Sequence, residues 1–408
     1  MAVFPRTRPQ TEARDHPSRP GGRTVMTSVL IVAGENSGEK YGAGLVRAFG
    51  RRRPEVRFFG VGGREMEEAG VEIVHRLEDL AVVGIFEVLS RLPRLHGIFR
   101  SLLAEARSRR PAAAVLIDSP DFNLRLARRL KKAGVPVLYY VSPTVWAWRP
   151  GRLKTIKSVV SRMLLIFPFE KEIYDRESIP ATYIGHPLLE YLSVRLPRTR
   201  FLRAHGLDPG KKLVAVLPGS RRGEVARHLP ILARGLGLLS ERIPLETVIL
   251  LAENLDPQVL SPPLPPGLER AKVISRDRFD ALAAADLILS ACGTANLEAA
   301  VLGRPLVTFY RISPLTYFFG RRLVKLSRFS MVNILAGRDV VPELIQGSFT
   351  PEALSAEALR VLTDQETVRG MEREFRRLRG LLGRKRPSSE AARELGRILR
   401  AAGSGEGR

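Results

Sequence analysis

Short apolar runs recur along the chain, and longer stretches in which apolar residues follow helical spacing separate them. Polar residues rarely interrupt these runs, which is typical of strands buried on both faces in a parallel sheet covered by helices. The pattern therefore predicts an α/β protein with two Rossmann-like domains that face a cleft. The first series of predicted strands occupies residues 29–33, 56–61, 113–117, 135–141 and 163–167, and the second occupies residues 212–217, 246–251, 272–274, 287–290 and 305–310.

Composition divides the chain into four parts. Residues 1–27 are polar, rich in Arg and Pro, and lack the apolar segment of a signal peptide, so we expect a disordered N-terminal extension with Met26 as an alternative start. A Pro- and Arg-rich stretch separates an N-terminal domain at 28–190 from a C-terminal domain at 206–365, and a basic helical tail follows at 366–408. Two Rossmann-like domains around a cleft form the glycosyltransferase B architecture. Other enzymes share it, so the fold alone leaves the function open.

The chain carries a large excess of positive charge, with 66 Lys and Arg against 42 Asp and Glu and a formal net charge of +24. Such an excess favours an anionic partner, namely nucleic acid, anionic lipid or a phosphorylated substrate, although an arginine-favouring genome gives the same composition. The one cysteine, Cys292, excludes a disulfide framework and fits a reducing cytoplasm. No apolar run reaches the length of a membrane-spanning helix.

The first predicted strand is followed at once by a glycine-rich turn and the start of a helix. Gly34, Ser37, Gly38 and Gly42 lie in this segment, and Ser37 breaks the GxGxxG spacing of a dinucleotide site. Ligands of parallel α/β sheets bind where strands end and helices begin, so the turn is a candidate site for a phosphate or a sugar. Tight packing of the helix on the sheet is the alternative.

A carboxylate follows another predicted strand. Asp118 comes directly after the run at 113–117, which places it at the carboxyl end of the sheet and facing the cleft. There it can take a proton from a sugar hydroxyl as a general base. The alternative is a helix N-cap, a role for which Asp121, after Pro120, is better placed.

Two motifs of the C-terminal domain predict a nucleotide site. In Leu-Pro-Gly-Ser-Arg, at 217–221, backbone N–H groups can bind phosphate and the Arg can make a forked contact with a diphosphate. In the stretch at 290–298, a Gly-Thr pair opens a helix whose N-terminus suits phosphate, and a Glu within it suits ribose hydroxyls. A plain strand–helix turn with a surface Arg is the alternative for the first motif. Together they predict a UDP-sugar site at Gly219, Ser220, Arg221, Gly293, Thr294 and Glu298.

Aromatic and amphipathic segments are candidates for binding acyl chains or a membrane. Trp146 and Trp148 follow a strand and suit a sugar face or an acyl chain, or form a core cluster. Residues 82–103 and 309–337 mix apolar and basic side chains as a helix on a membrane surface does, although such helices also pack on cores. In the first segment we select Phe86, Leu89 and Phe99. The six histidines are scattered, so we expect no metal site.

Taken together, these motifs resemble lipid-A-disaccharide synthase, a glycosyltransferase family of the lipid A pathway. The resemblance extends over about residues 28–380, and its motifs occur in the family's order. The segments that carry it are VAGENSGEKYGAG, LEDLAVVGIFEVLSRLPRL, IDSPDFNLRLARRLKKAG, YVSPTVWAWR, FPFEKEIYD, IGHPLLE, LPGSRRGEV, CGTANLEAAVLGRPLVTFYR and NILAGRDVVPELIQ.

The resemblance implies an inverting transfer in which UDP-2,3-diacylglucosamine donates its sugar to the 6-hydroxyl of 2,3-diacylglucosamine 1-phosphate. It implies no metal or cofactor, and a cytoplasmic enzyme peripheral on the anionic surface of the inner membrane, contributing to the lipopolysaccharide of the Gram-negative outer membrane. The family's essential acid matches Asp118, and its other functional positions match Ser37, Arg221, Glu298 and Asn333. The chain departs from the family at two positions, where Ser is usual at Cys292 and Asp at Glu39.

Two other classes of function compete with this interpretation. Another UDP-sugar enzyme of the same architecture, a UDP-N-acetylglucosamine 2-epimerase or a lipid II-type transferase, would have a similar nucleotide site. The segment at 82–103 and the paired Trp residues favour acylated sugars instead. A basic nucleic-acid-binding protein would explain the charge, but no nucleic-acid-binding motif is recognisable, so we expect no nucleic-acid partner.

Overall fold

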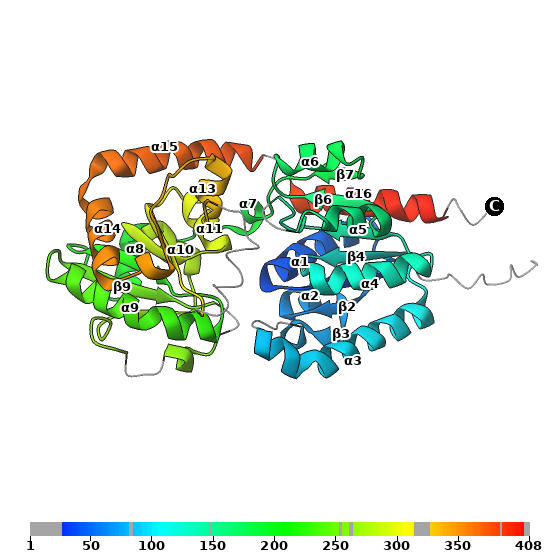
Figure 1. Ribbon diagram of the computed structural model, residues 1–408, viewed down its shortest axis with the longest axis horizontal. Helices are drawn as coiled ribbons and strands as arrows, with labels where there is room; N and C mark the ends of the chain where they lie inside the picture. Colours follow the sequence, from blue (N-terminus) through cyan, green and yellow to red (C-terminus); the bar gives the residue numbers. More distant parts are fainter. Residues whose placement is uncertain are drawn as a thin grey trace, which may run out of the picture.

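The chain folds into two lobes, each built on one parallel β-sheet (Figure 1). The protein is described from a computed structural model, over residues 27–80, 85–146, 149–252, 255–260, 264–313, 327–383 and 386–403, and the side chains of 85–92 are not described. The first 26 residues of the expected disordered extension lie outside these ranges, as do residues 314–326 of the second amphipathic segment.

The N-terminal lobe contains a seven-stranded sheet in the order β3-β2-β1-β4-β5-β6-β7. All of its neighbouring strands pair in parallel, and β1 lies beside β4 with Ala33 opposite Ile117. Since the strand order reverses between β1 and β4, the turns after these two strands meet at the switch point where ligands of such sheets bind. The strands are β1 (Ser28–Ala33), β2 (Arg57–Gly62), β3 (Val71–Arg76), β4 (Ala113–Ile117), β5 (Val137–Tyr140), β6 (Arg162–Leu165) and β7 (Ala181–Tyr183).

The C-terminal lobe repeats this plan with six strands in the order β10-β9-β8-β11-β12-β13. Its pairs are also parallel, and the order reverses between β8 and β11, where Leu217 lies opposite Ser290. The two predicted nucleotide motifs follow these two strands. The strands are β8 (Lys212–Leu217), β9 (Leu245–Leu250), β10 (Lys272–Ile274), β11 (Leu287–Ala291), β12 (Leu306–Tyr310) and β13 (Glu343–Ile345).

Helices cover both faces of each sheet, because the central strands are apolar on both faces and must be buried on both. Every residue of β4 and of β11 is buried. The predicted α/β class with two Rossmann-like units is confirmed. The helices are α1 (Asn36–Gly50), α2 (Arg64–Glu68), α3 (Ile85–Arg109), α4 (Pro120–Lys132), α5 (Arg152–Val159), α6 (Glu170–Arg176), α7 (Leu188–Tyr191), α8 (Arg198–Ala204), α9 (Arg222–Ser240), α10 (Arg278–Ala284), α11 (Thr294–Val301), α13 (Met331–Ala336), α14 (Pro351–Thr363), α15 (Gln365–Leu381) and α16 (Pro387–Gly403).

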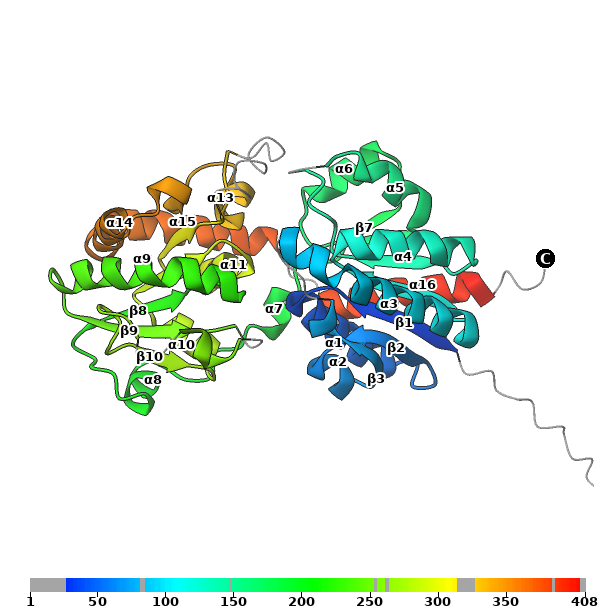
Figure 2. The same cartoon turned by 60° about the horizontal axis from the view of Figure 1, so that its bottom comes forward.

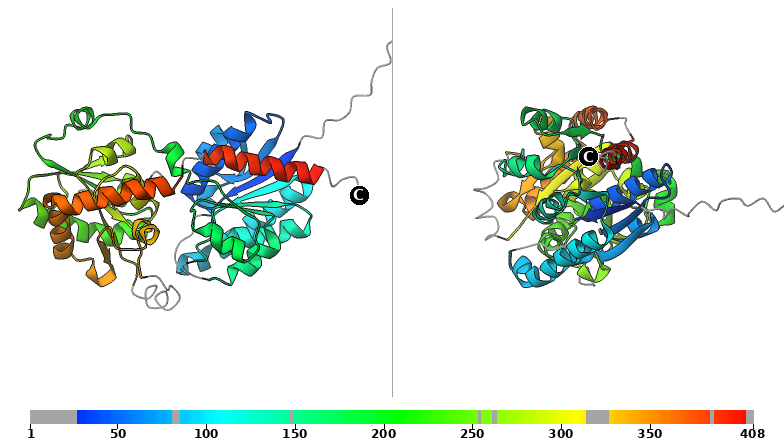
Figure 3. Two further views of the ribbon diagram at one scale, coloured as in Figure 1. Left: turned by 90° about the horizontal axis from the view of Figure 1, so that it is seen from above. Right: turned by 90° about the vertical axis from the view of Figure 1, so that its right-hand side faces the viewer.

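The C-terminal segment divides between the two lobes. Helix α15 packs on the C-terminal lobe, whereas α16 returns to the N-terminal lobe and lies against α1 (Figures 1 and 3). Leu395 of α16 is completely buried in the same apolar cluster as Leu45 of α1. The chain thus crosses between the lobes twice, once near α7 and once between α15 and α16, and at this second crossing the His186 N–H donates to the Leu382 carbonyl oxygen at 3.1 Å.

The sequence pattern did not predict three of the strands, β3, β7 and β13. The edge strand β3 reads Val-Glu-Ile-Val-His-Arg and is mostly half-buried or exposed, so it lacks a continuous apolar run. Strands β7 and β13 contain three residues each and bury only one of them, so their apolar signal is weak, although the pattern did predict β10, which is equally short. Within the described residues no helix combines the length and the apolar composition that crossing a bilayer requires.

Candidate active site

Asp118 lies directly after β4, in a turn whose backbone is left-handed at two successive residues. The φ angles are 55° at Asp118 and 43° at Ser119, a strained arrangement for residues other than glycine. Surrounding groups hold it: the Tyr139 hydroxyl and the Asn123 amide donate to the Asp118 carbonyl oxygen at 2.7 and 2.8 Å. The Asp118 N–H donates to the Tyr140 carbonyl oxygen at 3.0 Å. The turn therefore holds the carboxyl at the edge of the sheet that faces the other lobe.

The glycine-rich turn after β1 packs directly against the Asp118 turn. The Gly34 N–H donates to the Ile117 carbonyl oxygen at 3.1 Å, and a Cβ on Gly34 would lie 2.0 Å from the Ser119 Cβ. Cβ atoms on Gly38 and Gly42 would meet the Ile117 side chain at 3.2 and 3.0 Å. These glycines therefore serve close packing. Ser37, in the first turn of α1, is partly buried.

Burial and a neighbouring carboxylate change the acidity of Asp118. Loss of water around the carboxyl and the negative charge of Glu35 raise the pKa of Asp118 to about 7, against a hydrogen bond from the Ser119 N–H that lowers it. The helix-cap alternative is wrong, because α4 begins at Pro120 after Ser119. Asp121 lies inside the first turn and pairs with Arg152 at 2.5 Å and Arg149 at 3.2 Å.

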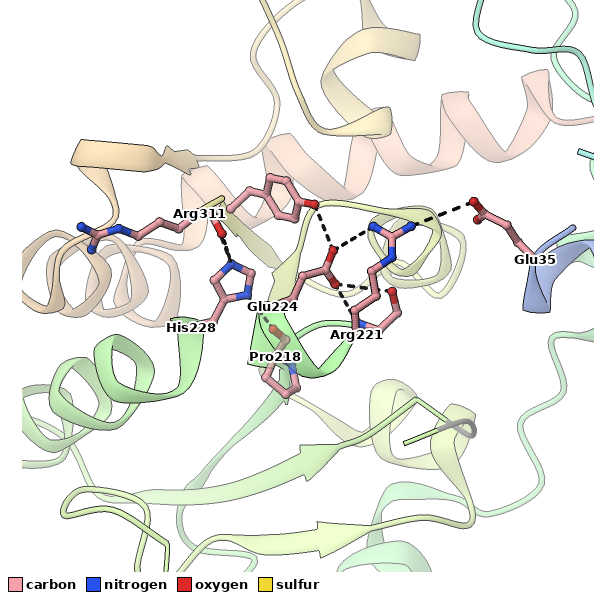
Figure 4. A network of polar contacts seen from close by, with 8 residues as sticks. Glu35, Pro218, Arg221, Glu224, His228 and Arg311 are labelled. Atoms are coloured by element: carbon pink, nitrogen blue, oxygen red, sulfur yellow. Dashed lines mark hydrogen bonds and ion pairs between the residues drawn. The ribbon is translucent and has the colours of Figure 1, made fainter. Parts of the chain in front are cut away.

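The turn after β8 is organised by one buried carboxylate (Figure 4). Glu224 Oε2 accepts from the Ser220 N–H at 3.0 Å, and Glu224 Oε1 accepts from Arg221 Nη1 and the Tyr310 hydroxyl, both at 3.0 Å. Gly219 has a φ of 143°, and a Cβ there would lie 2.7 Å from the Glu224 Cβ. Glu224 thus orients Arg221, and it already uses the Ser220 N–H that the sequence suggested for a phosphate.

A buried histidine connects this turn to the end of β12. His228 Nδ1 lies 2.7 Å from the Pro218 carbonyl oxygen, and the Arg311 N–H donates to Nε2 at 3.0 Å (Figure 4). Burial lowers the pKa of His228, which favours the neutral ring, with Nδ1 as donor and Nε2 as acceptor. The imidazole therefore holds two strand ends together.

One ion pair joins the two lobes at this point. The Glu35 carboxylate, in the turn after β1, lies 4.0 Å from Arg221 Nη2 (Figure 4). Glu35 follows Gly34 directly, so the packing that sets the Asp118 turn also sets this residue. The candidate base and the candidate diphosphate-binding Arg are therefore linked electrostatically through Glu35.

The start of α11 provides the second part of the predicted nucleotide site. Gly293 precedes the helix, Thr294 begins it, and a Cβ on Gly293 would meet no described atom within 4 Å, so this helix end faces open space. The Glu298 carboxylate is 8% exposed and pairs with Arg278 Nη2 of α10 at 2.7 Å. This pairing orients the carboxylate.

The two departures from the family's motifs have structural explanations. Loss of water around the thiol raises the pKa of Cys292 to about 12, and its Sγ lies 3.6 Å from Thr308 Oγ1, so this half-buried side chain is a small protonated group. Glu39 Oε1 accepts from the Glu65 N–H at 2.8 Å, at the first turn of α2, where carboxylates stabilise a helix.

Asn333 is fully hydrogen-bonded within the protein. Its Oδ1 accepts from the Val340 and Val341 N–H groups at 2.7 and 3.0 Å, and its Nδ2 donates to the Val341 carbonyl oxygen and to Glu343 Oε1. The side chain is 1% exposed. In this conformation it has no group to offer a substrate and instead holds the loop at 340–343.

The aromatic candidates are only partly described. Trp146 packs edge-to-face on Phe169, with ring centroids 5.4 Å apart, and Phe169 is 36% exposed. Trp148 lies outside the described residues, and so do the side chains of Phe86 and Leu89 on α3. Phe99 is half-buried and contacts Phe122 edge-to-face at 5.7 Å, which favours the core-packing alternative for this residue.

Sequence reasoning missed four residues that the structure brings to the candidate site, namely Glu35, Glu224, His228 and Arg278. The spacing of Glu224 three positions after Arg221 on one helix start was a usable signal. The partners of the other three come from distant parts of the chain, so no local pattern identifies them. Among the described residues, no group of three or more His, Cys, Asp and Glu side chains could hold a metal ion.

The chain is similar in sequence to one enzyme family over nearly its whole length. A family model described as lipid-A-disaccharide synthetase matches residues 29–394. A lipid-A-disaccharide synthase of Koribacter versatilis is 47% identical over 344 residues, covering 83% of this chain and 89% of that protein. One of Syntrophus aciditrophicus is 42% identical over 360 residues, covering 87% and 93%.

Solved structures share the fold at low sequence identity. A calicheamicin glycosyltransferase aligns with a TM-score of 0.59 at 16% identity, covering 92% of this chain and 98% of that chain. The UDP-GlcNAc 2-epimerase of Neisseria meningitidis aligns with a TM-score of 0.60 at 13% identity, covering 92% and 100%. These likenesses confirm the glycosyltransferase B architecture and, by themselves, no more than the fold.

The contact at Gly34 gives a direct test of how the site is held. Gly34→Ala should lower the free energy of unfolding by about 2 kcal/mol or more, because the new Cβ overlaps Ser119 in a packed turn. Gly50→Ala, at the end of the helix α1 that follows this turn and with no atom within 4 Å of its Cβ, is the control and should change the free energy of unfolding by less than about 0.5 kcal/mol. Urea unfolding of both variants measures the difference, and equal effects would contradict the packing argument.

Proposed function

Since the chain belongs to the lipid-A-disaccharide synthetase family and is a glycosyltransferase, we propose that it joins two acylated glucosamines. UDP-2,3-diacylglucosamine is the donor, 2,3-diacylglucosamine 1-phosphate is the acceptor, and UDP leaves. Family membership favours this reaction over the epimerase, lipid II transferase and nucleic-acid-binding alternatives. The observation that carries the mechanism is the placement of Asp118 beside Glu35 and, across the lobes, Arg221.

In the proposed mechanism Asp118 is the general base. Its carboxylate takes the proton of the acceptor's 6-hydroxyl as that oxygen bonds to C1 of the donor sugar and the bond from C1 to the phosphate oxygen breaks. Attack from the face opposite the leaving group inverts the configuration at C1. A base with a pKa near 7 is matched to neutral pH, because it is half ionised there and still binds a proton well. Ser37, at the same sheet edge, is proposed to contact the reacting sugars.

The C-terminal lobe is proposed to bind the nucleotide and stabilise its departure. Arg221, oriented by Glu224, and the open N-terminus of α11 at Gly293 and Thr294 supply positive charge for the diphosphate without a metal. Glu298, oriented by Arg278, accepts from the ribose hydroxyls. Glu35 lies near Arg221. The diphosphate would replace it there.

The acyl chains of both substrates require contact with a bilayer, and we propose a peripheral position on the cytoplasmic surface of the inner membrane. Phe86 and Leu89 lie near the start of α3, at the end of the lobe that faces the C-terminal lobe (Figure 2). Trp146 and Trp148 are proposed to contact the acylated acceptor. The excess positive charge suits the phosphates and an anionic lipid surface.

Asp118→Asn should lower kcat by about 10²–10⁴-fold while leaving the folded protein intact, because an amide cannot take the acceptor's proton. UDP release measured with both acylated substrates gives the rate. Asp121→Asn is the matched control, since its carboxylate lies three positions away and pairs with Arg152 on the surface. A rate within tenfold of the unmodified enzyme for Asp118→Asn would reject the base assignment.

The pH dependence of kcat/KM should report the ionisation of Asp118. Activity should rise through a midpoint near pH 7, because only the ionised carboxylate accepts a proton, and Glu35→Gln should move this midpoint to lower pH. Glu172→Gln, exposed on α6, is the control and should leave the midpoint unchanged. An identical midpoint in the Glu35 variant would contradict the proposed coupling.

Binding of UDP should depend on both halves of the nucleotide site. Glu298→Gln and Arg221→Ala should each weaken UDP binding by roughly tenfold to a hundredfold, the usual loss for a hydrogen bond to a charged group. Glu241→Gln, exposed at the end of α9, is the control. Calorimetric titration with UDP measures the affinities, and unchanged affinity in both variants would rule out the site as proposed.

A further inference from the structure

A wide groove of about 2200 Å³ lies on the N-terminal lobe, away from the catalytic turns. Its walls come from the C-terminal parts of α3, α4 and α16 and from residues just before β1, β4 and β5. These three helices end on the side of the lobe where β1 begins (Figure 2). Ser37 and Asp118 follow the carboxyl ends of β1 and β4. The groove lies at the amino ends of these strands, so it is on the opposite side of the lobe from the proposed acceptor site.

The groove is strongly basic. Ten Lys or Arg residues line it, against one acid, Glu394, which already pairs with Arg397 at 2.6 Å and Arg162 at 3.6 Å. Six of the basic residues have no acidic partner in the part of the chain that the structure describes, and these are Arg100, Arg107, Arg110, Arg129, Lys132 and Arg400. So many unpaired like charges around one hollow favour an anion from outside.

Stabilisation of helix ends accounts for only part of this charge. Arg107, Arg129 and Arg400 lie in the last turns of their helices, where basic side chains offset the helix dipole. Arg100 lies more than two turns before the end of α3, beyond the reach of that effect, and Arg110 lies after the helix with a φ of 42°. Their convergence on the same groove therefore needs a second explanation.

Part of the groove's lining is apolar. Phe99, Leu103 and Ile398 line it and are half-buried, so they present apolar surface alongside the basic side chains. A wholly hydrophilic polyanion gains nothing from this apolar surface. An amphiphile with a phosphate and a hydrocarbon chain matches both kinds of lining.

Two possible occupants of the groove come from the protein itself, and both carry the same positive charge as the groove. Residues 1–26 contain five Arg against two acids, so this segment would be repelled. A second copy of the chain carries a net charge of +24 and is a poor partner for a basic groove.

We propose that this groove binds the headgroup phosphate and the adjoining acyl chain of an anionic membrane phospholipid. Helix α3 then runs from the end of the lobe that faces the C-terminal lobe, where Phe86 and Leu89 lie, to a second membrane contact at its other end. The proposal rests on the proposed membrane partner and does not depend on the catalytic assignments.

Flotation of the full chain with vesicles tests the proposal. The vesicles contain phosphatidylcholine with phosphatidylglycerol, or phosphatidylcholine alone. A triple variant, Arg107→Glu, Arg129→Glu and Arg400→Glu, should bind the anionic vesicles more than tenfold more weakly than the unmodified chain. The control variant, Arg203→Glu, Arg234→Glu and Arg376→Glu, makes the same charge change at exposed helical positions of the C-terminal lobe and should stay within twofold.

The possible outcomes distinguish vesicle binding through the groove from binding through the overall positive charge and from effects on catalysis. Equal losses in both triple variants, or no loss in the groove variant, would overturn the proposal. Competition by soluble polyphosphate but not by added phosphatidylglycerol would also overturn it, since the ligand would then be a simple polyanion. If the glutamate variant does not fold, as a circular dichroism melt would reveal, the corresponding Arg→Gln variant replaces it. If the groove variant loses vesicle binding but still releases UDP from detergent-dispersed substrates, the result supports the proposed groove. If the unmodified chain releases no UDP, the result rejects the proposed function alone.

Discussion

The close approach of two strand-end turns in the N-terminal lobe, at Gly34 and Ser119, is the constraint on which the rest of the site depends. It leaves no room for a side chain at Gly34 and packs that turn against the left-handed backbone at Asp118. It also places Glu35 where its charge acts on Asp118 and lies near Arg221 of the other lobe. A single packing contact thus positions the proposed base, adjusts its pKa and aligns it with the proposed site of the leaving group.

The two lobes are held in register around this point by apolar contacts as well as by the ion pair. The ring of Tyr191, on α7 between the lobes, lies 6.3 Å from that of Tyr41 on α1 and 6.1 Å from that of Phe279 on α10. Leu297 of α11 is buried in the apolar cluster of the N-terminal lobe. The return of α16 adds a second covalent connection, which restricts how far the lobes can separate (Figure 3). Helix α11, part of the proposed nucleotide site, and the turn that carries Asp118 therefore belong to one packed unit.

The sequence predicted the elements whose physical signal is local. Continuous apolar runs identified the buried central strands, and the residues after them placed Asp118, Arg221 and Gly293 at strand ends, where the structure has them. The edge strands β3, β7 and β13, which are short or half-exposed, gave a weaker signal and were not predicted. The supporting residues Arg278 and His228 were not predicted, because their partners come from other segments of the chain. The packing of α16 on the N-terminal lobe was not predicted either, because an amphipathic pattern does not say which lobe covers the apolar face of a helix. The sequence motif that contains Asn333 also did not show that its side chain forms hydrogen bonds within the protein.

The central claim is that the Asp118 carboxyl ionises near neutral pH because it is shielded from water and lies beside Glu35. Titration of the protein labelled with ¹³C at the aspartate carboxyl carbons measures this directly, and the Asp118→Asn variant identifies the resonance by its loss. The account predicts a midpoint near pH 7 for this resonance. A midpoint near pH 4, the ordinary value for a solvated aspartate, would contradict it.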